Sequence, residues 1–342
     1  MRAFTCDTCG QLLFFENSRC LRCNSRLGLV PSRLDIVVLD EPAHSTLRPC
    51  ANAELAQCNW VLEEGDPGPL CLSCRLTRTR PADSDADGLA AFAKAEGAKR
   101  RLIFQLLDLG LPIGDDLAFD LLSSRTGPVV TGHSDGVITI DLAESDDARR
   151  EQRRTALGEP YRTILGHFRH EIGHYYWPVL VQRRAGELER ARALFGDDRV
   201  DYESTLQRHY RDGPAPDWSE RHVSAYATMH PWEDWAETFA HYLHIRDTLE
   251  TAAAFGLVVA GPDGSEDGLL SSVPVTEAGD RPFEAIIADW LPLTYALNAI
   301  NRSMGHEDLY PFTLAPTVID KLAFVHQRVR AAVRQARMPA TP

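Results

Sequence analysis

The stretch His170-Glu171-Ile172-Gly173-His174 decides how this chain is interpreted. Its two histidines are four residues apart, so on a helix both imidazoles lie on one face and can reach a single metal ion. Glu171 stands beside them, where it can act on a water at that ion without binding the metal itself. Zinc at a catalytic site holds three protein ligands and keeps its fourth position open. The stretch therefore predicts an open zinc site whose third ligand lies elsewhere in the chain.

Candidates for the third ligand lie in a second predicted helix that begins at Pro231, a residue that suits a first helical position. Large aromatic residues recur behind it at helical spacing: Trp232, Trp235, Phe239 and Tyr242. Glu233 and Glu237 are four residues apart and therefore share one face of this helix. One of them could ligate zinc while the other accepts a hydrogen bond from a ligand imidazole. The spacing alone leaves both assignments open.

His167 precedes His170 by one helical turn and lies on the same face. A fourth protein ligand would close the site, so we expect His167 to be a hydrogen-bonding neighbour or a core residue. An HExxH pattern also arises by chance, and two histidines on one face could form a hydrogen-bonded core. The downstream pair of glutamates favours the metal site.

All eight cysteines fall within the first 74 residues. The first four form two C-x-x-C knuckles with the spacing of a zinc ribbon: Cys6, Cys9, Cys20 and Cys23. Gly10 and Asn24 follow these knuckles, where the chain commonly adopts a left-handed conformation. A second set has irregular gaps: Cys50, Cys58, Cys71 and Cys74. We expect two structural zinc sites rather than disulfides. His44 could replace one thiolate of the second set, and a cross-braced pairing between the sets stays open.

There is a physical reason to expect bound metal in the N-terminal region. The first 80 residues have few consecutive apolar positions and could not bury enough surface to fold alone, so closed tetrathiolate sites would supply the missing stability. The ribbon is then a folding device, or alternatively a docking module for a protein partner or a substrate. A polar, acidic stretch at residues 81–88 marks a boundary. We therefore predict a zinc ribbon domain at residues 1–80 and a second domain at residues 81–342.

Charge and hydropathy exclude several partners. Residues 1–80 hold nine arginines and nine acidic residues, so the other 27 basic and 40 acidic residues carry the whole net charge of −13. This balance disfavours nucleic acid. No apolar run approaches the roughly 18 residues that a membrane span needs, and the N-terminus does not resemble a signal peptide. We expect a soluble, cytoplasmic protein without a membrane partner.

Several longer phrases carry a resemblance. They are Cys58-Asn59-Trp60, residues 98–102, Thr131-Gly132-His133, residues 159–163, residues 166–171, residues 230–237 and Tyr242-Leu243-His244. In these phrases the chain resembles the bacterial family of zinc-binding metallopeptidases that joins an N-terminal zinc ribbon to a gluzincin-like domain. The phrases span most of the sequence, and the metal residues follow the family pattern without departure.

The resemblance implies roles for individual residues. In gluzincin peptidases a Glu ligand is followed one turn later by an acidic residue that orients a zinc-bound histidine, which corresponds here to Glu233 and Glu237. Lethal-factor-like gluzincins carry a tyrosine seven residues before the Glu ligand, so Tyr226 becomes the donor that stabilises the oxyanion. His230 and His222 are its rivals, and a buried core tyrosine is the plainer interpretation.

The resemblance also implies a fold and a reaction. We expect an α+β, zincin-like metallopeptidase domain that is mainly helical with a small sheet. The expected enzyme is a zinc metallopeptidase that hydrolyses a peptide or protein substrate through metal-activated water, with Glu171 as general base. It would hold one catalytic and two structural zinc ions, and its ribbon could bind a protein partner. The alternative is an inactive or self-limited, zinc-stabilised adaptor.

Local patterns predict the elements around the site. Residues 89–110 form an amphipathic helix, and residues 129–140 form a hairpin that turns at Asp135-Gly136. Zincins place an edge strand before the active-site helix, so residues 137–142 could be that strand or an ordinary one. The active-site helix should open at Glu159-Pro160 and run to Trp177. Residues 197–222 should be rich in loops, and the chain from residue 283 to about residue 337 should be mostly helical.

Overall fold

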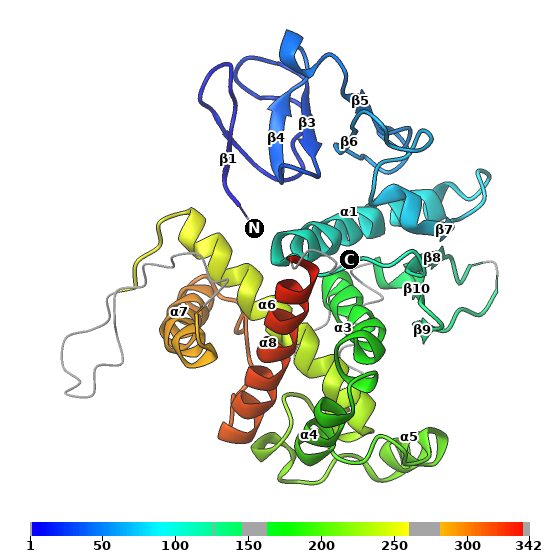
Figure 1. The fold of residues 1–342 in the computed structure, drawn as a ribbon, viewed down its shortest axis with the longest axis vertical. Coiled ribbons are helices and arrows are strands. Elements are labelled where there is room, and N and C mark those ends of the chain that lie inside the picture. The colour runs from blue at the N-terminus through cyan, green and yellow to red at the C-terminus, as the bar shows by residue number, and fades with distance from the viewer. Residues whose placement is uncertain (1, 126, 146–162, 260–280, 338–342) are drawn as a thin grey trace, which may run out of the picture. The chain divides into compact units, whose positions relative to one another are not determined.

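A computed structural model describes residues 2–125, 127–145, 163–259 and 281–337. The chain divides into two compact units, coloured by residue number in Figure 1. One unit contains Met1–Thr155 and Arg162–Phe168, and the other contains Ala156–Tyr161 and Arg169–Pro342. The N-terminal cysteine-rich region therefore shares a unit with the helix and the sheet that follow it. The predicted boundary near residue 80 stays a prediction.

Short antiparallel hairpins build the N-terminal part of the first unit. The strand pairs are β1 (Phe4–Thr5) with β2 (Leu12–Leu13), β3 (Leu27–Val30) with β4 (Asp35–Val38), and β5 (Arg48–Pro49) with β6 (Val61–Leu62). Two 3-10 turns, η1 (Pro42–His44) and η2 (Cys74–Leu76), accompany them. Val30, Val37 and Val61 form a small buried cluster between the hairpins. Short strands of two to four residues are typical of a region that takes part of its stability from bound metal.

Helix α1 (Ala86–Leu109) confirms the predicted amphipathic helix. Asp85 caps its N-terminus by accepting a hydrogen bond from the amide of Gly88 at 2.9 Å, and Gly110 ends it with a left-handed φ of 71°. Its apolar face buries Phe92, Leu102, Ile103 and Leu106. Leu89 and Leu107 are half-buried.

A four-stranded sheet completes the first unit, in the order β7 (Thr77–Thr79), β8 (Ala118–Leu122), β10 (Val137–Asp141) and β9 (Gly132–Ser134). The predicted hairpin is confirmed, because β9 and β10 are antiparallel and Asp135 and Gly136 turn between them with φ of 49° and 83°. Of the two alternatives for residues 137–142, the edge strand is wrong and the ordinary sheet strand is confirmed. Strand β10 pairs with β8 on one side and with β9 on the other, so its backbone groups are already used within the sheet. The 3-10 turn η3 (Leu142–Ser145) follows.

The described part of the second unit is helical. Its elements after α3 (Ile164–Trp177) are η4 (Pro178–Gln182), α4 (Ala185–Phe195), α5 (Tyr202–Asp212), η5 (Trp218–Glu220), η6 (Tyr226–Thr228), α6 (Pro231–Ala254), α7 (Phe283–Ser303) and α8 (Pro316–Arg337). Helix α3 begins in the first unit, and the residues from Arg169 onward belong to the second. The predicted opening of this helix at Glu159-Pro160 lies outside the described residues.

Aromatic packing holds the second unit together around α6, which contacts α4, α7 and α8 (Figure 1). Trp235 is fully buried at the centre, with ring centroids 5.4 Å from Trp177, 5.9 Å from Phe195 and 5.8 Å from Phe239. Such edge-to-face pairs stabilise a core beyond the area that they bury. This packing fixes the face of α6 opposite the metal residues. The first turn of α6, which carries Glu233, therefore has a defined orientation.

The combination of helices, a small sheet and a cysteine-rich N-terminus agrees with the predicted α+β class. Residues 197–222 are more helical than predicted, since α5 occupies 11 of them. Asp201 caps α5 by accepting a hydrogen bond from the amide of Ser204 at 2.8 Å, a start signal that was readable in the sequence. Among the described helices, none has an apolar stretch long enough to cross a membrane.

Candidate metal centres

The HExxH histidines and Glu233 converge because α3 and α6 approach closely. Trp235 Nε1 donates a hydrogen bond to the carbonyl of Gly173 at 2.8 Å and ties the two helices together. Gly173 has a steric role here: an added Cβ would lie 3.0 Å from Ala236 Cα and 3.1 Å from the Ala236 carbonyl oxygen. Even a methyl group would fit here only if the two backbones moved apart by a few tenths of an ångström. The glycine inside the HExxH stretch thus brings the ligand helices within reach of each other.

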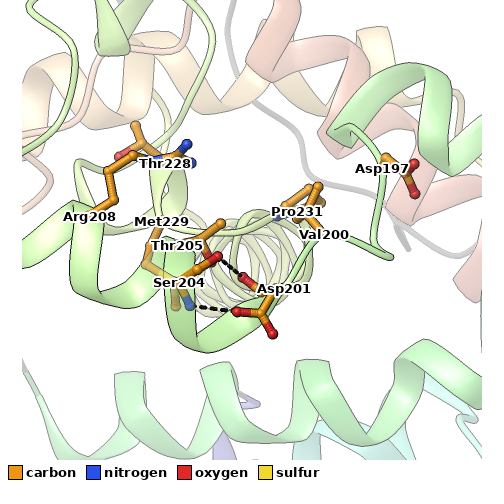
Figure 2. Close-up of a pocket in the computed structure, with 9 residues that line it drawn as sticks. All are labelled: Asp197, Val200, Asp201, Ser204, Thr205, Arg208, Thr228, Met229 and Pro231. Atoms are coloured by element: carbon orange, nitrogen blue, oxygen red, sulfur yellow. Dashed lines mark hydrogen bonds between the residues drawn. The ribbon is translucent and has the colours of Figure 1, made fainter.

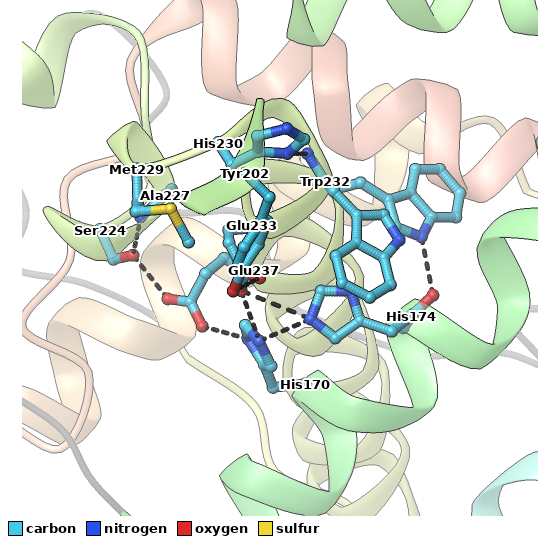
Figure 3. Close-up of polar contacts among 12 residues, drawn as sticks. His170, His174, Tyr202, Ser224, Ala227, Met229, His230, Trp232, Glu233 and Glu237 are labelled. Atoms are coloured by element: carbon cyan, nitrogen blue, oxygen red, sulfur yellow. Dashed lines mark hydrogen bonds and ion pairs between the residues drawn. The ribbon is translucent and has the colours of Figure 1, made fainter. Parts of the chain in front are cut away.

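Three donor atoms meet at one point. His170 Nε2 lies 3.1 Å from His174 Nε2 and 3.0 Å from Glu233 Oε2, and His174 Nε2 lies 3.4 Å from the same carboxylate oxygen. Figure 3 shows this triangle between the two helices. Ligands held tetrahedrally at about 2.0–2.1 Å from a zinc ion lie about 3.3–3.4 Å from one another. The donor set and its spacing therefore fit zinc.

Glu237 contacts His170 at Nδ1, the ring nitrogen that does not belong to the donor triangle. Its Oε1 lies 2.7 Å from His170 Nδ1, and its Oε2 accepts a hydrogen bond from Ser224 Oγ at 2.5 Å. Burial would raise the pKa of Glu237, but its hydrogen bond to His170 and the charge of that histidine lower the pKa to about 2. An ionised carboxylate on Nδ1 leaves Nε2 facing the metal position. The geometry thus separates two glutamates that spacing alone could not distinguish.

Glu171 lies beside the donor triangle and is 7% exposed. Its Oε2 is buried and has no hydrogen-bond partner among the described residues. Burial raises the pKa of this carboxyl to about 7, against the opposing charge of His170. A buried carboxylate oxygen without a partner is costly unless it meets a ligand or a cation. This orphaned oxygen is a second indication that the site is built for an ion and a reacting group.

Tyr226 lies in η6 with its ring centroid 6.0 Å from that of His170. Burial and the nearby Glu233 charge raise the pKa of Tyr226 far above its usual value, so its hydroxyl keeps its proton. Its rival His230 is occupied elsewhere. As the N-cap of α6, its Nδ1 accepts a hydrogen bond from the amide of Trp232 at 3.0 Å, and its Nε2 lies 3.1 Å from the carbonyl of Val200.

The two remaining histidine candidates lie apart from the donor triangle. His222 Nε2 is 3.8 Å from Asp234 Oδ2, which in turn accepts a hydrogen bond from Lys321 at 2.6 Å. His167 Nδ1 is 3.9 Å from Glu144 Oε2 within the first unit. Neither histidine belongs to the set of donor atoms that could share one ion.

Sequence reasoning missed three neighbours of the site. Tyr202, the first residue of α5, donates a hydrogen bond from its hydroxyl to Glu233 Oε1 at 2.9 Å. Ser224 donates to Glu237, and the ring of Trp232 lies 3.8 Å from that of His174, centroid to centroid. Trp232 was recognised only as part of the aromatic spacing of α6. No pattern in the sequence pointed to the other two, because their partners lie on different elements.

The cysteines form two separate clusters in the first unit. The members are Cys6, Cys9, Cys20 and Cys23 in one, and Cys50, Cys58, Cys71 and Cys74 in the other. Within the first cluster two pairs of sulfur atoms are 3.6 Å apart, and within the second Cys58 and Cys71 are 3.7 Å apart. Tetrahedral thiolates at about 2.3 Å from zinc lie about 3.8 Å apart, whereas disulfide sulfurs lie about 2.05 Å apart. Both clusters therefore fit zinc, each with its own four cysteines.

Local backbone geometry agrees with the predicted knuckles. Gly10 and Asn24 have φ of 69° and 61°, and their amides donate hydrogen bonds to the carbonyls of Cys6 and Cys20 at 2.8 and 2.9 Å. His44 does not replace a thiolate, because the donor atoms that lie together in the second cluster are those of its four cysteines and not of His44. The cross-braced arrangement is likewise not what the described residues form.

Comparison with known proteins agrees with this geometry. A family model described as "Putative zinc-binding metallo-peptidase" matches residues 88–328, and a zinc-ribbon domain model matches residues 3–85. Uncharacterized proteins from Mycobacterium bovis and from two strains of Mycobacterium tuberculosis are each 53% identical over 333 residues. The match covers 95% of this chain and 94% of each relative. No solved structure matches.

Proposed function

This chain belongs to the zinc-binding metallopeptidase family, and we propose that it hydrolyses peptide bonds at the site formed by His170, His174 and Glu233. The observation that carries the proposal is the convergence of these three donor atoms beside the orphaned carboxylate oxygen of Glu171. A pure metal-binding scaffold has no use for a buried carboxyl next to its ligands. A zincin-like arrangement of the helical domain is part of the proposal.

The proposed roles follow from the contacts. A bound zinc ion would supply Lewis acidity and lower the pKa of water at the site. Glu171 accepts the proton of the attacking water on its free Oε2 and later delivers it to the leaving amine. Tyr226 keeps its hydroxyl proton and can donate a hydrogen bond to the oxyanion that forms from the scissile carbonyl. Glu237 holds His170 in the orientation that binding needs.

The ribbon has two proposed roles. Its two cysteine clusters fit two structural zinc ions, which would make three per chain together with the proposed catalytic ion. The first hairpin and knuckle also expose apolar side chains, since Leu12 is 38%, Phe14 is 57% and Leu21 is 91% exposed. One role is in folding, and these exposed side chains are where we propose that a protein partner would contact the ribbon. Eight thiols held for metal also suit a reducing compartment, so the cytoplasmic location stays our prediction.

Glu171→Gln tests the enzyme against the adaptor. The variant keeps the side-chain volume and all three ligands but loses the group that accepts the proton. We expect unchanged zinc content and melting temperature, and loss of hydrolysis of a peptide that the wild type demonstrably cleaves from a diverse library. Full activity in the variant would contradict the proposed mechanism. Failure of the zinc-loaded wild type to cleave any library peptide would instead favour the inactive adaptor.

A further inference from the structure

The carboxylate of Glu233 has two oxygens with different surroundings. Oε2 faces the two histidines, at 3.0 Å from His170 Nε2 and 3.4 Å from His174 Nε2. Oε1 accepts the hydroxyl hydrogen bond of Tyr202 at 2.9 Å (Figure 3). We propose that Tyr202 is a positioning residue of the metal site, whose hydroxyl occupies Oε1 so that Glu233 presents only Oε2 to the ion. This inference rests on the proposed zinc site but not on peptidase activity.

The physical reason is that a carboxylate can bind a metal through one oxygen or two. Glu233 is 2% exposed, so an oxygen that is not bonded to the ion cannot rely on water. A hydrogen bond to an ionised acceptor is roughly twice as strong as one between neutral groups. The Tyr202 hydroxyl therefore stabilises the one-oxygen arrangement, which keeps the ligand count at three and the fourth position open.

The ring of Tyr202 is held independently of its hydroxyl. Its centroid lies 5.3 Å from that of His230 and 6.1 Å from that of Trp232, in edge or tilted contacts at the start of α6. Replacing Tyr202 with Phe would keep these contacts and remove only the hydrogen bond. The side chain is 36% exposed, so the removal leaves no cavity in the core.

Helix α5 otherwise buries few of its side chains against the rest of the unit. Thr205 is its single buried residue among those described. A surface pocket of about 490 Å³ lies along it, lined by Asp201, Thr205 and Arg208 of α5 and by Met229 and Pro231 at the start of α6 (Figure 2). The bond from Tyr202 to Glu233 joins α5 directly to a proposed ligand, whereas Thr205 and His209 contact Met229 and Thr228, which are not ligands. Zinc binding should therefore also order α5.

Tyr226 provides the contrast. Its hydroxyl interacts with that of Tyr202, and this contact contributes to the raised pKa of Tyr226. The two tyrosines differ in their acceptor: Tyr202 donates to an oxygen of Glu233, whereas among the described residues the hydroxyl of Tyr226 contacts that of Tyr202. We expect Tyr202 to govern metal affinity and Tyr226 to govern turnover.

The test uses the full chain with its cysteine clusters loaded with zinc and the third site titrated with Co²⁺ or Zn²⁺. Tyr202→Phe should weaken metal binding at this site roughly 10–100-fold, the usual effect of removing a partner of a ligand. It should also shift the visible absorption of the cobalt-loaded site, because the coordination by Glu233 changes. Hydrogen exchange in α5 should lose its dependence on metal. The matched control is Tyr210→Phe, on the same helix with a 67% exposed side chain, which should change none of these readouts.

The outcomes distinguish a failure of the positioning role of Tyr202 from a failure of the proposed metal site. Wild type that binds no metal at His170 and His174 would contradict the proposed site itself. Wild-type binding with unchanged affinity and an unchanged cobalt spectrum in Tyr202→Phe would overturn the positioning role alone. Weaker binding in Tyr202→Phe, with unchanged binding in Tyr226→Phe, would support it. A loss of affinity in Tyr210→Phe equal to that in Tyr202→Phe would also overturn it, since the effect would then belong to α5 in general.

Discussion

Replacing Gly173 with Ala sets two opposing effects against each other. Alanine is better than glycine in a helix interior by about 1 kcal/mol. The new Cβ, however, would lie 3.0 Å from Ala236 Cα and 3.1 Å from its carbonyl oxygen, and neither atom belongs to a flexible side chain. Carbon atoms pack at about 3.5–4.0 Å, so α3 and α6 would have to separate by a few tenths of an ångström. Overpacking of this kind costs roughly 1–3 kcal/mol.

We therefore expect Gly173→Ala to be less stable than wild type by about 1 kcal/mol, and its metal site to suffer more. Metal–ligand distances tolerate only about 0.2 Å, so a separation of the helices should lower zinc affinity at least about tenfold. Urea unfolding of the metal-free protein and a chelator competition measure the two effects. Gly97→Ala is the matched control, because the nearest atom to its new Cβ is the end of the Arg100 side chain at 3.9 Å, and it should be stabilising. A Gly173→Ala protein that is more stable and binds zinc normally would refute the reasoning.

Three further predictions follow from the sites. Glu233→Ala should empty the catalytic site, whereas Glu237→Ala should keep zinc with roughly 10–100-fold weaker affinity. Metal analysis of both variants tests this, and the reverse result would exchange the roles of the two glutamates. Elemental analysis should find three zinc ions per chain, and the open three-ligand site should lose its ion first under mild chelation. A single ion in fully loaded protein would contradict the two thiolate sites. Burial lowers the pKa of His326 to about 4, and its Nδ1 and Nε2 already contact the Tyr242 hydroxyl and the Arg281 carbonyl. Because the unfolded chain binds a proton near pH 6.5 and the folded chain does not, stability should fall by up to about 3 kcal/mol between pH 6.5 and 4. His326→Gln should reduce that slope in urea unfolding, and an identical slope would contradict the assignment.

The sequence was most informative where function depends on spacing along one element. Two histidines four residues apart, a proline before a pair of glutamates, and C-x-x-C followed by glycine or asparagine all specify local geometry. The structure brings His170 and His174 together with Glu233, the glutamate that the family resemblance, and not the spacing, indicated as the ligand. Their catalytic roles stay predictions until they are measured.

Contacts between elements were harder to foresee. Tyr202 is 31 positions before Glu233, and Ser224 is 13 before Glu237, so no periodicity links either pair. The prediction of an edge strand was wrong for a similar reason. Residues 137–142 read as a strand, but whether a strand is central or at an edge depends on its neighbours, and β8 comes from a part of the chain that showed no strand pattern to us.

The spacing of the thiols has a consequence for the redox chemistry of the protein. Cys6 and Cys23, and likewise Cys9 and Cys20, hold their sulfur atoms 3.6 Å apart. A disulfide needs about 2.05 Å, so the sulfur atoms of each pair need to approach by only about 1.5 Å to form a covalent link across the two knuckles. Zinc and oxidation thus compete for the same thiols: an oxidant that reaches the metal-free ribbon can lock it in a form that no longer accepts zinc. Loss of metal and loss of reducing conditions would then act together, and refolding of the ribbon would require a reductant as well as zinc.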